Sequence, residues 1–267
     1  MQERFVDIAT PDGRMKTFVV HPEQDGPFPP VVLYMDVWGV REQLYDIARR
    51  IASVGYCCVV PDLYYRVAWA PFDLRDATGR TISLLRLTDE MQAKVRAARQ
   101  HLKDAMVVAD SRAILDVLDG DPAVRPGPVG SVGYCMGGRH VVCVAAAWPD
   151  RFRASACLHG TSLVTDGAYS PHLGAPRIRG ELYCGFAEHD PFAPPATIRA
   201  MREILAGTPV RYREQIHLGA DHGYAIPDRD IYDKRAAERD WELIFAMYHR
   251  QLGPYGAAPG TASATTR

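Results

Sequence analysis

Residues 130–139 read Gly-Ser-Val-Gly-Tyr-Cys-Met-Gly-Gly-Arg and hold the most informative pattern in the chain. They follow Pro126-Gly127-Pro128, a turn signal, and a β-branched run that predicts a buried strand over 128–134. The apolar run after them predicts a buried helix over 136–148. Cys135 therefore lies at a strand-to-helix turn with glycines two residues before and after it. We expect glycine at both places because the two backbones approach too closely there for a Cβ atom.

The glycine-flanked cysteine has the form of a nucleophile elbow, Gly-x-Ser-x-Gly, with a thiol in place of the hydroxyl. Such a turn exposes the side chain above the sheet. It also places the sulfur of Cys135 at the N-terminus of the next helix, whose positive end favours a thiolate. The alternative interpretation is a buried structural cysteine at a tight turn. The position between strand and helix favours a nucleophile.

The composition is that of a globular protein, with 267 residues, 47% hydrophobic residues and a net charge of −1. This length suits a single α/β domain over 1–252, followed by a disordered Pro-, Gly- and Ala-rich tail over 253–267. The balanced charge gives no electrostatic basis for binding nucleic acid or an anionic membrane. We find no apolar run of transmembrane length and no signal segment, and therefore expect a cytoplasmic protein.

The six cysteines include no Cys-x-x-Cys pair, so neither a zinc site nor a thioredoxin-type redox pair is indicated. We expect no metal and no cofactor. Only Cys135 has a setting that favours reactivity. The others are expected to be packed, four of them in apolar strands: Cys57, Cys58, Cys157 and Cys184, with Cys143 on the helix after Cys135.

Strand and helix patterns alternate along most of the chain, which predicts an α/β fold with a mostly parallel, twisted sheet and helices on both faces. The segment 64–87 lacks clear periodicity and, with the helix up to 103, is expected to form a cap-like excursion over the carboxyl ends of the strands. Residues 161–176 are expected to form a loop. The predicted strands are 4–9, 14–20, 31–35, 56–60, 128–134, 154–158, 180–186 and 210–217. The predicted helices are 41–54, two within 88–118, and 136–148, 195–205 and 229–252.

Several polar side chains, like Cys135, come directly after predicted strands: Asp36, His159, Asp190 and His222. Parallel sheets bind ligands at the carboxyl ends of their strands, so we expect these residues to form one site. A thiol nucleophile needs a base, and the base needs a partner that fixes its tautomer. The chain order of elbow enzymes is nucleophile, acid, histidine, which selects Cys135, Asp190 and His222.

Other assignments are weaker. His217 is the second choice as base, whereas His189 comes too early in the chain. Asp221 adjoins His222 and neighbouring loop residues seldom face each other, while Asp166 lies in a stretch without predicted structure. An acyl-transfer site also needs oxyanion donors, for which the backbone amides of Met136 and Val37 are the natural candidates.

With these residues assigned, the sequence resembles the dienelactone hydrolase family of α/β-hydrolases from about residue 31 to 252. The resemblance implies the α/β-hydrolase fold, a cofactor-free Cys-His-Asp triad, and hydrolysis of a small ester or lactone through an acyl-enzyme. The motifs that carry it are Asp36-Val37-Trp38-Gly39-Val40, Pro61-Asp62-Leu63-Tyr64, Gly133-Tyr134-Cys135-Met136-Gly137-Gly138, the Asp190 turn and Asp221-His222-Gly223-Tyr224.

Two positions depart from the archetype of that family. The archetype has a glutamate where this chain has Asp36, and the resemblance implies that this carboxylate modulates ionisation of the nucleophile. Aspartate reaches about 1.5 Å less far, enough to break a direct hydrogen bond, and a strand-end residue capping the next loop is the alternative role. The archetype also has a substrate-binding arginine where this chain has Ile226, which favours a less anionic, more apolar substrate.

The resemblance further implies a second carboxylate-binding arginine in the excursion, where the candidates are Arg66, Arg75, Arg80 and Arg86. Candidate walls of the substrate pocket are Trp38, Tyr64, Tyr134, His159 and Tyr224, together with Ile226. Each is also compatible with ordinary packing. Two other functions remain compatible with the same residues. One is hydrolysis of a thioester or a carbon–carbon bond by the same triad, and the other is a non-catalytic redox-sensing or ligand-binding protein with this fold.

Overall fold

An eight-stranded sheet with the order β1-β2-β4-β3-β5-β6-β7-β8 forms the centre of the computed structural model, which describes residues 1–67 and 74–253. β1 and β2 form the predicted hairpin and join β4 antiparallel, and every other pairing is parallel. The predicted mostly parallel α/β fold is therefore confirmed. The strands are β1 (Gln2–Thr10), β2 (Gly13–His21), β3 (Pro30–Tyr34), β4 (Cys57–Pro61), β5 (Val129–Tyr134), β6 (Phe152–Leu158), β7 (Glu181–His189) and β8 (Arg211–Asp221).

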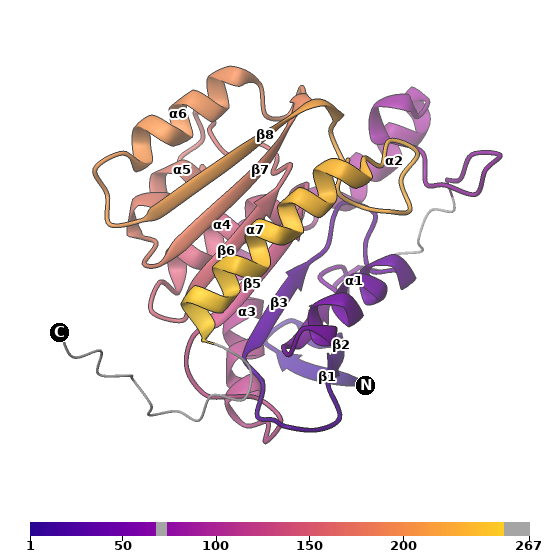
Figure 1. The fold of residues 1–267 in the computed structure, drawn as a ribbon. Helices are drawn as coiled ribbons and strands as arrows, with labels where there is room; N and C mark the ends of the chain where they lie inside the picture. The colour runs from indigo at the N-terminus through magenta and orange to yellow at the C-terminus, as the bar shows by residue number, and fades with distance from the viewer. Residues whose placement is uncertain (68–73, 254–267) are drawn as a thin grey trace.

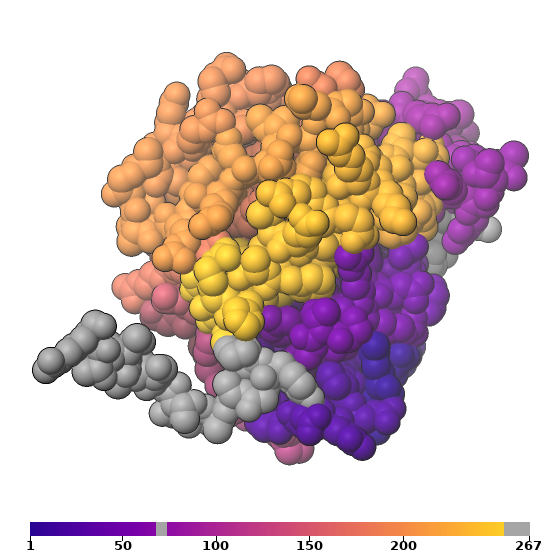
Figure 2. Space-filling view, in the orientation of Figure 1, coloured from indigo at the N-terminus to yellow at the C-terminus, as the bar shows by residue number. Residues whose placement is uncertain are grey.

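Helices cover both faces of the sheet (Figure 1). On one face, α1 (Glu42–Ser53) packs on β2 to β4 and α7 (Lys234–Leu252) packs on β5 to β8. On the other, α4 (Met136–Ala147) packs on β3, β5 and β6, beside α3 (Asp104–Asp119). In Figure 2, the yellow surface of α7 runs between the purple N-terminal third and the orange residues that precede it. The remaining helices are η1 (Leu84–Arg86), α2 (Asp89–Gln100), α5 (Pro171–Gly174), η2 (Ala175–Arg177) and α6 (Pro195–Leu205).

The middle of the sheet is buried on both faces. Every residue of β3, β4 and β5 is buried, because helices cover them from either side, and such strands are continuous apolar runs. β5 lies between β3 and β6, with Val132 opposite Leu33 on one side and Ala156 on the other. The residue after β5 therefore emerges at the centre of the carboxyl edge of the sheet. That residue is Cys135.

Several element boundaries differ from the predictions. The predicted loop 161–176 contains α5 and the start of η2, and β7 and β8 extend to His189 and Asp221. α7 begins at Lys234 rather than at residue 229, because the Asp233 side chain caps it by accepting a hydrogen bond from the Ala236 amide (3.0 Å). These differences lie at element ends or in one-turn helices, where short-range patterns carry little signal.

The excursion is described except for residues 68–73, which, like 254–267 of the expected tail, lie outside the described residues. Its Leu87 and its Val95, on α2, pack with Val37 and Trp38, which follow β3. The excursion therefore covers one part of the carboxyl edge of the sheet. None of the helices in residues 1–67 and 74–253 has the length and hydropathy needed to span a bilayer.

Candidate active site

Cys135 is the turn residue between β5 and α4, with φ +55° and ψ −114°. A left-handed backbone at a non-glycine residue costs about 1–3 kcal/mol and is retained where the surroundings impose it. Here the surroundings are the flanking glycines. A Cβ atom at Gly133 would collide with the carbonyl of Gly137, and one at Gly137 would collide with the carbonyls that end β3. The close backbone approach expected from the sequence is thus the reason for both glycines.

The His222 ring is held by Asp190. Its Nδ1 donates a hydrogen bond to Oδ2 of Asp190 over 2.7 Å, and both side chains are buried. The other carboxylate oxygen of Asp190 accepts from the amides of Phe192 (2.8 Å) and Ala193 (3.2 Å). The loop after β7 therefore fixes the carboxylate, and the carboxylate fixes the orientation of the imidazole.

The charge on His222 is set by its neighbours. Burial lowers the pKa of the imidazole, but the negative charge of the Cys135 sulfur and the hydrogen bond to Asp190 outweigh it and raise the pKa to about 10. The second ring nitrogen, Nε2, has no hydrogen-bond partner among the described residues. The structure therefore brings Cys135, His222 and Asp190 together, and the raised pKa of His222 keeps its ring as imidazolium at neutral pH.

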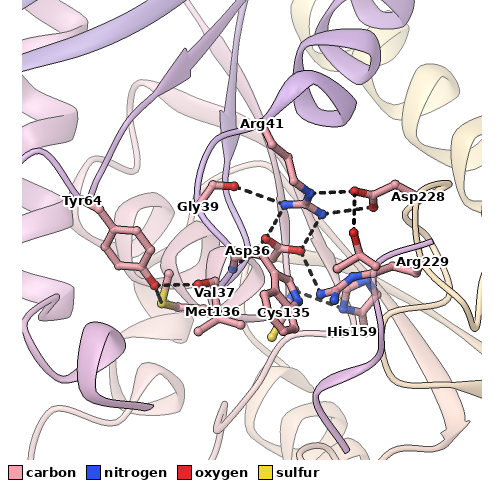
Figure 3. A network of polar contacts seen from close by, with 12 residues as sticks. Asp36, Val37, Gly39, Arg41, Tyr64, Cys135, Met136, His159, Asp228 and Arg229 are labelled. Atoms are coloured by element: carbon pink, nitrogen blue, oxygen red, sulfur yellow. Dashed lines mark hydrogen bonds and ion pairs between the residues drawn. The ribbon is translucent and has the colours of Figure 1, made fainter. Parts of the chain in front are cut away.

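The backbone amides predicted to bind an oxyanion are those of Met136 and Val37. Met136 is the first residue of α4 and Val37 follows β3, and neither amide donates a hydrogen bond to another described residue. The Tyr64 hydroxyl donates to the carbonyl of Val37 (3.0 Å) and lies 3.9 Å from the sulfur of Met136 (Figure 3). Tyr64 thus links the two segments that carry these amides.

Asp36 is fully buried and its carboxylate is saturated by donors other than Cys135 (Figure 3). Oδ1 accepts from the Trp38 amide (3.0 Å) and from Arg41 (2.8 Å). Oδ2 accepts from Arg41 (3.1 Å) and from Arg229 (3.0 Å). The contact with Trp38 is the loop cap that formed the alternative interpretation, and no hydrogen bond joins Asp36 to the Cys135 sulfur among the described residues.

Arg229 binds Asp36 and interacts electrostatically with Cys135, and no local sequence pattern predicts this role. Its guanidinium is buried, lies 4.8 Å from the centre of the Trp38 ring and leaves Nε and Nη1 without a partner among the described residues. Burial lowers the pKa of Arg229, while Asp36 and Cys135 both favour its charged form. Arg41, also not predicted, binds Asp36 and Asp228 together and completes a network of two arginines and two aspartates.

The candidate pocket walls are all buried: Trp38, Tyr64, Tyr134, His159, Tyr224 and Ile226. Tyr134 belongs to the strand core and touches the site only through a ring contact with His159. Tyr224 donates its hydroxyl to Asp240 (2.6 Å) behind the site. The Nδ1 atom of His159 accepts a hydrogen bond from the backbone amide of Cys135 (3.1 Å).

Three of the four candidate arginines of the excursion are engaged elsewhere, and Arg80 has no side-chain partner among the described residues. Arg66 and Arg86 are therefore neutralised by carboxylates, and Arg75 and Arg80 are exposed. The contacts are Arg66 with Asp12 and Asp110, Arg75 with the carbonyl of Gly79, and Arg86 with Asp230.

Other cations lie next to the elbow. A cavity of about 430 Å³ beside Met136 is lined by Arg96 and Arg99 from α2. The one carboxylate in its lining, Asp104, forms a two-pronged ion pair with Arg139. Arg96 and Arg99 form no ion pair within the described part of the chain, so the cavity carries excess positive charge.

The weaker assignments lie elsewhere. His217 pairs with Asp240 (2.7 Å) rather than with a residue of this site. His189 ends β7 with an exposed side chain, and Asp166 and Asp221 are also exposed.

All six cysteines are free. Burial raises the pKa of Cys57, Cys58 and Cys143, and a hydrogen bond with Cys157 together with burial raises that of Cys184. These four are poor nucleophiles, because burial disfavours their thiolates. The residues that the structure describes contain no group of three or more His, Cys, Asp or Glu side chains arranged to hold a metal ion.

The chain is similar to known proteins in sequence and in fold. The profile of the dienelactone hydrolase family matches residues 15–252. A Synechocystis protein named "Putative carboxymethylenebutenolidase" is 25% identical over 250 residues, with 92% of this chain and 96% of the relative covered. An Escherichia coli protein of the same name is 27% identical over 261 residues (93% and 87% covered).

A crystal structure titled as a putative dienelactone hydrolase, from Klebsiella pneumoniae, superposes with a TM-score of 0.80 at 22% identity. It covers 93% of this chain and 98% of that one, which confirms the α/β-hydrolase fold. The match of the family profile to most of the chain confirms the expected hydrolase. This chain belongs to the dienelactone hydrolase family.

Proposed function

We propose that this chain hydrolyses a small ester or lactone through an acyl-enzyme on Cys135, with His222 as acid and base and Asp190 orienting His222. The observation that carries the proposal is the buried hydrogen bond from His222 to Asp190, with the free Nε2 of the same ring next to the elbow cysteine. A partnered base beside a thiol at a strained turn is the arrangement that nucleophilic acyl transfer requires.

In the acylation step, the Cys135 thiolate attacks the carbonyl carbon and forms a carbon–sulfur bond. The amides of Met136 and Val37 donate hydrogen bonds to the resulting oxyanion. When the tetrahedral intermediate collapses, the carbon–oxygen bond to the leaving group breaks and Nε2 of His222 gives its proton to the departing alkoxide. The products are an alcohol and a thioester on Cys135, and His222 is left neutral. With a lactone, the released alcohol remains attached to the acyl group.

In the deacylation step, neutral His222 takes a proton from a water molecule that attacks the thioester carbonyl. The carbon–sulfur bond then breaks, which releases the carboxylic acid and restores the thiolate and imidazolium pair. Asp190 keeps Nδ1 protonated throughout, so Nε2 is always the nitrogen that exchanges protons. No cofactor takes part in either step.

The cations around the elbow bear on the substrate. Ile226 favours an apolar group, but Arg229 places a buried charge near Cys135, and Arg96 and Arg99 add charge beside Met136. These cations support an ester or lactone that also carries a carboxylate, rather than the less anionic substrate favoured by Ile226 alone. A matched pair of esters, with and without a terminal carboxylate, tests this by the ratio of their kcat/KM values. A ratio that favours the uncharged ester would support the apolar substrate instead.

The central test compares Cys135→Ala with Cys143→Ala, a half-buried thiol on the same helix whose pKa burial raises to about 12. With a p-nitrophenyl ester, we expect Cys135→Ala to lose at least about 10³-fold in kcat/KM and to form no acyl adduct by mass spectrometry. Cys143→Ala should retain turnover and adduct. Unchanged turnover of Cys135→Ala would overturn the assignment. A thioester or carbon–carbon substrate turned over faster than any ester would redirect the proposal to that bond.

A further inference from the structure

His159 occupies an unusual place in the site. It follows β6, has a left-handed backbone (φ +37°) and is completely buried. Its ring lies edge-on to the rings of His222, with centroids 5.0 Å apart, and of Tyr224, at 5.4 Å. Its Nδ1 accepts a hydrogen bond from the Cys135 amide (3.1 Å), which is shared with the carbonyl of Leu158 (3.0 Å) (Figure 3). The imidazole therefore lies between the backbone of the nucleophile and the ring of the base, although the two steps of acyl transfer do not use it.

The hydrogen bond from Cys135 fixes the tautomer of His159. A backbone N–H can only donate, so Nδ1 must be unprotonated and a neutral ring must carry its proton on Nε2. That Nε2 is buried and has no partner among the described residues. Retaining a buried, unsatisfied donor is unfavourable, which makes a packing role alone a poor explanation for a histidine here.

The charges that face His159 keep it neutral. They are His222, from the turn after β8, and Arg229, from the segment before α7, and both are cationic. Burial and these two neighbours lower the pKa of His159 well below its usual value. The ring therefore remains a hydrogen-bond acceptor for the Cys135 amide while His222 is charged. A third cation in this place would repel both neighbours.

The ring is also supported from behind. Tyr224 packs edge-on to it and donates its hydroxyl to Asp240, which is buried and also accepts from Tyr183. This support limits movement of the His159 ring away from Cys135 and His222. The amide of His159 itself donates to the carbonyl of Gly185 (2.8 Å), which ties the residue to β7.

We propose that His159 is a positioning residue of the acyl-transfer site, which acts as a neutral imidazole that accepts the Cys135 amide at Nδ1 and packs against the His222 ring. It holds the strained turn of the nucleophile and the base in one geometry. The inference rests on the proposed function of Cys135 and His222, and it adds that Nδ1 of His159, rather than the bulk of its ring, is the part required.

Two substitutions separate the parts of the ring. His159→Asn places an amide oxygen near the position of Nδ1, so it retains an acceptor for Cys135, and asparagine tolerates a left-handed backbone. His159→Gln places its amide near the position of Nε2 and loses that acceptor. With a p-nitrophenyl ester, we expect His159→Asn to stay within about threefold of wild type. His159→Gln should lose about tenfold in kcat with little change in KM, because it misplaces reacting atoms rather than substrate.

His172→Asn provides the control, because this histidine also hydrogen-bonds through Nδ1, to Ser170 (2.7 Å), but lies on α5. Its kcat should equal that of wild type. Thermal unfolding of all variants separates loss of positioning from loss of fold. Equal losses in His159→Asn and His159→Gln, or wild-type activity in both, would overturn the inference.

A measurement on the unmodified protein avoids dependence on folding of the variants. Nitrogen NMR of histidine-labelled protein reports which ring nitrogen carries the proton, with His159 assigned from the spectrum of His159→Asn or His159→Gln. We expect an unprotonated Nδ1 and a protonated Nε2 at neutral pH, and a protonated Nδ1 would overturn the inference.

Different results would contradict the proposed function and the positioning role of His159. Absence of an acyl adduct on wild-type Cys135 contradicts the function, whereas an adduct that forms equally well in every His159 variant contradicts only the positioning role.

Discussion

Two histidines only five residues apart along the chain each form a buried pair with an aspartate, His222 with Asp190 and His217 with Asp240. In both, the ring nitrogen lies 2.7 Å from the carboxylate oxygen and the histidine is 7% exposed. They differ in what surrounds them. The remaining contacts of Asp240 are two tyrosine hydroxyls, from Tyr183 and Tyr224, whereas those of Asp190 are backbone amides of its own loop.

In the mechanism that we propose, only His222 acts as a base, although both histidines form an equally short hydrogen bond to an aspartate. His222 binds its carboxylate through Nδ1 and keeps Nε2 for the cysteine at the elbow. His217 uses Nε2 for its carboxylate and packs against Tyr224 in a network that joins β7, β8 and α7. The first pair is arranged for proton transfer and the second for holding elements together.

The largest expected difference is between His222→Gln and His217→Gln. We expect His222→Gln to lose about 10⁴-fold or more in kcat/KM with a p-nitrophenyl ester, because no group remains to keep the thiolate or activate water. His217→Gln should stay within about threefold of wild type and unfold at a lower temperature. Steady-state kinetics with thermal unfolding checks both, and a comparable loss of activity in His217→Gln would remove the distinction.

Substitution of the two aspartates should likewise affect activity in one case and stability in the other. Asp190→Asn is expected to lower kcat about 10³-fold with little change in stability, since it no longer fixes the tautomer of His222. Asp240→Asn should instead lower the free energy of unfolding by about 3 kcal/mol, because the Asp240 carboxylate accepts buried hydrogen bonds from Tyr183, His217 and Tyr224, and the amide nitrogen of asparagine cannot accept one. Denaturant titration and kinetics on the two variants measure this. If Asp190→Asn lost as much stability as is expected for Asp240→Asn, the assignment of Asp190 as the residue that orients His222 would be contradicted.

A pH profile tests the charge on His222. Its pKa is raised to about 10, so the ring stays protonated below that pH and loses its proton as the pH rises through it. For an alkyl ester, whose poor leaving group needs a proton, kcat/KM should therefore fall above about pH 10. Alkylation of Cys135 by iodoacetamide needs only the thiolate and should not fall there. His217→Gln should show the same loss of kcat/KM above about pH 10. A loss of kcat/KM that begins near pH 7 would contradict the raised pKa of His222.

The smallest expected effect concerns the tyrosines of the second pair. Tyr183→Phe removes one of the hydroxyls that donate a hydrogen bond to Asp240. It should lower the free energy of unfolding by about 1 kcal/mol. Activity should not change. Tyr169→Phe, at a residue that is 90% exposed, is the control and should be neutral. A loss of turnover in Tyr183→Phe would show that the second pair reaches the chemistry directly.

The fold was predictable because its signals are local. Hydrophobic periodicity and turn residues gave every strand and the main helices, and the elbow identified the centre of the sheet. The order of Asp190 and His222 after Cys135 then gave the site residues that the structure brings together. Local patterns cannot predict which charged residues distant in sequence will pair. Arg229 lies 193 residues from Asp36, and the sequence near either residue does not indicate the other as its partner.

The one-turn helices α5 and η2 were missed for a related reason. Such short helices are stabilised by tertiary packing rather than by their own sequence, and Pro171 and Ala175 are buried against the rest of the molecule. The deduction from Ile226 had the same weakness. It identified the loss of one arginine, but it could not show that Arg229, three residues further on, supplies a cation from the same segment.

Two main-chain hydrogen bonds join the excursion to the segment that carries Arg229. The Thr81 amide donates to the carbonyl of Asp228 (2.7 Å), and the Asp230 amide donates to the carbonyl of Thr81 (3.1 Å). Residues 228–230 therefore move with the strand-like turn around Thr81 unless these bonds break. The backbone on both sides of Arg229 is thus anchored to the excursion, so a segment remote in sequence helps to set where this buried cation lies beside Asp36.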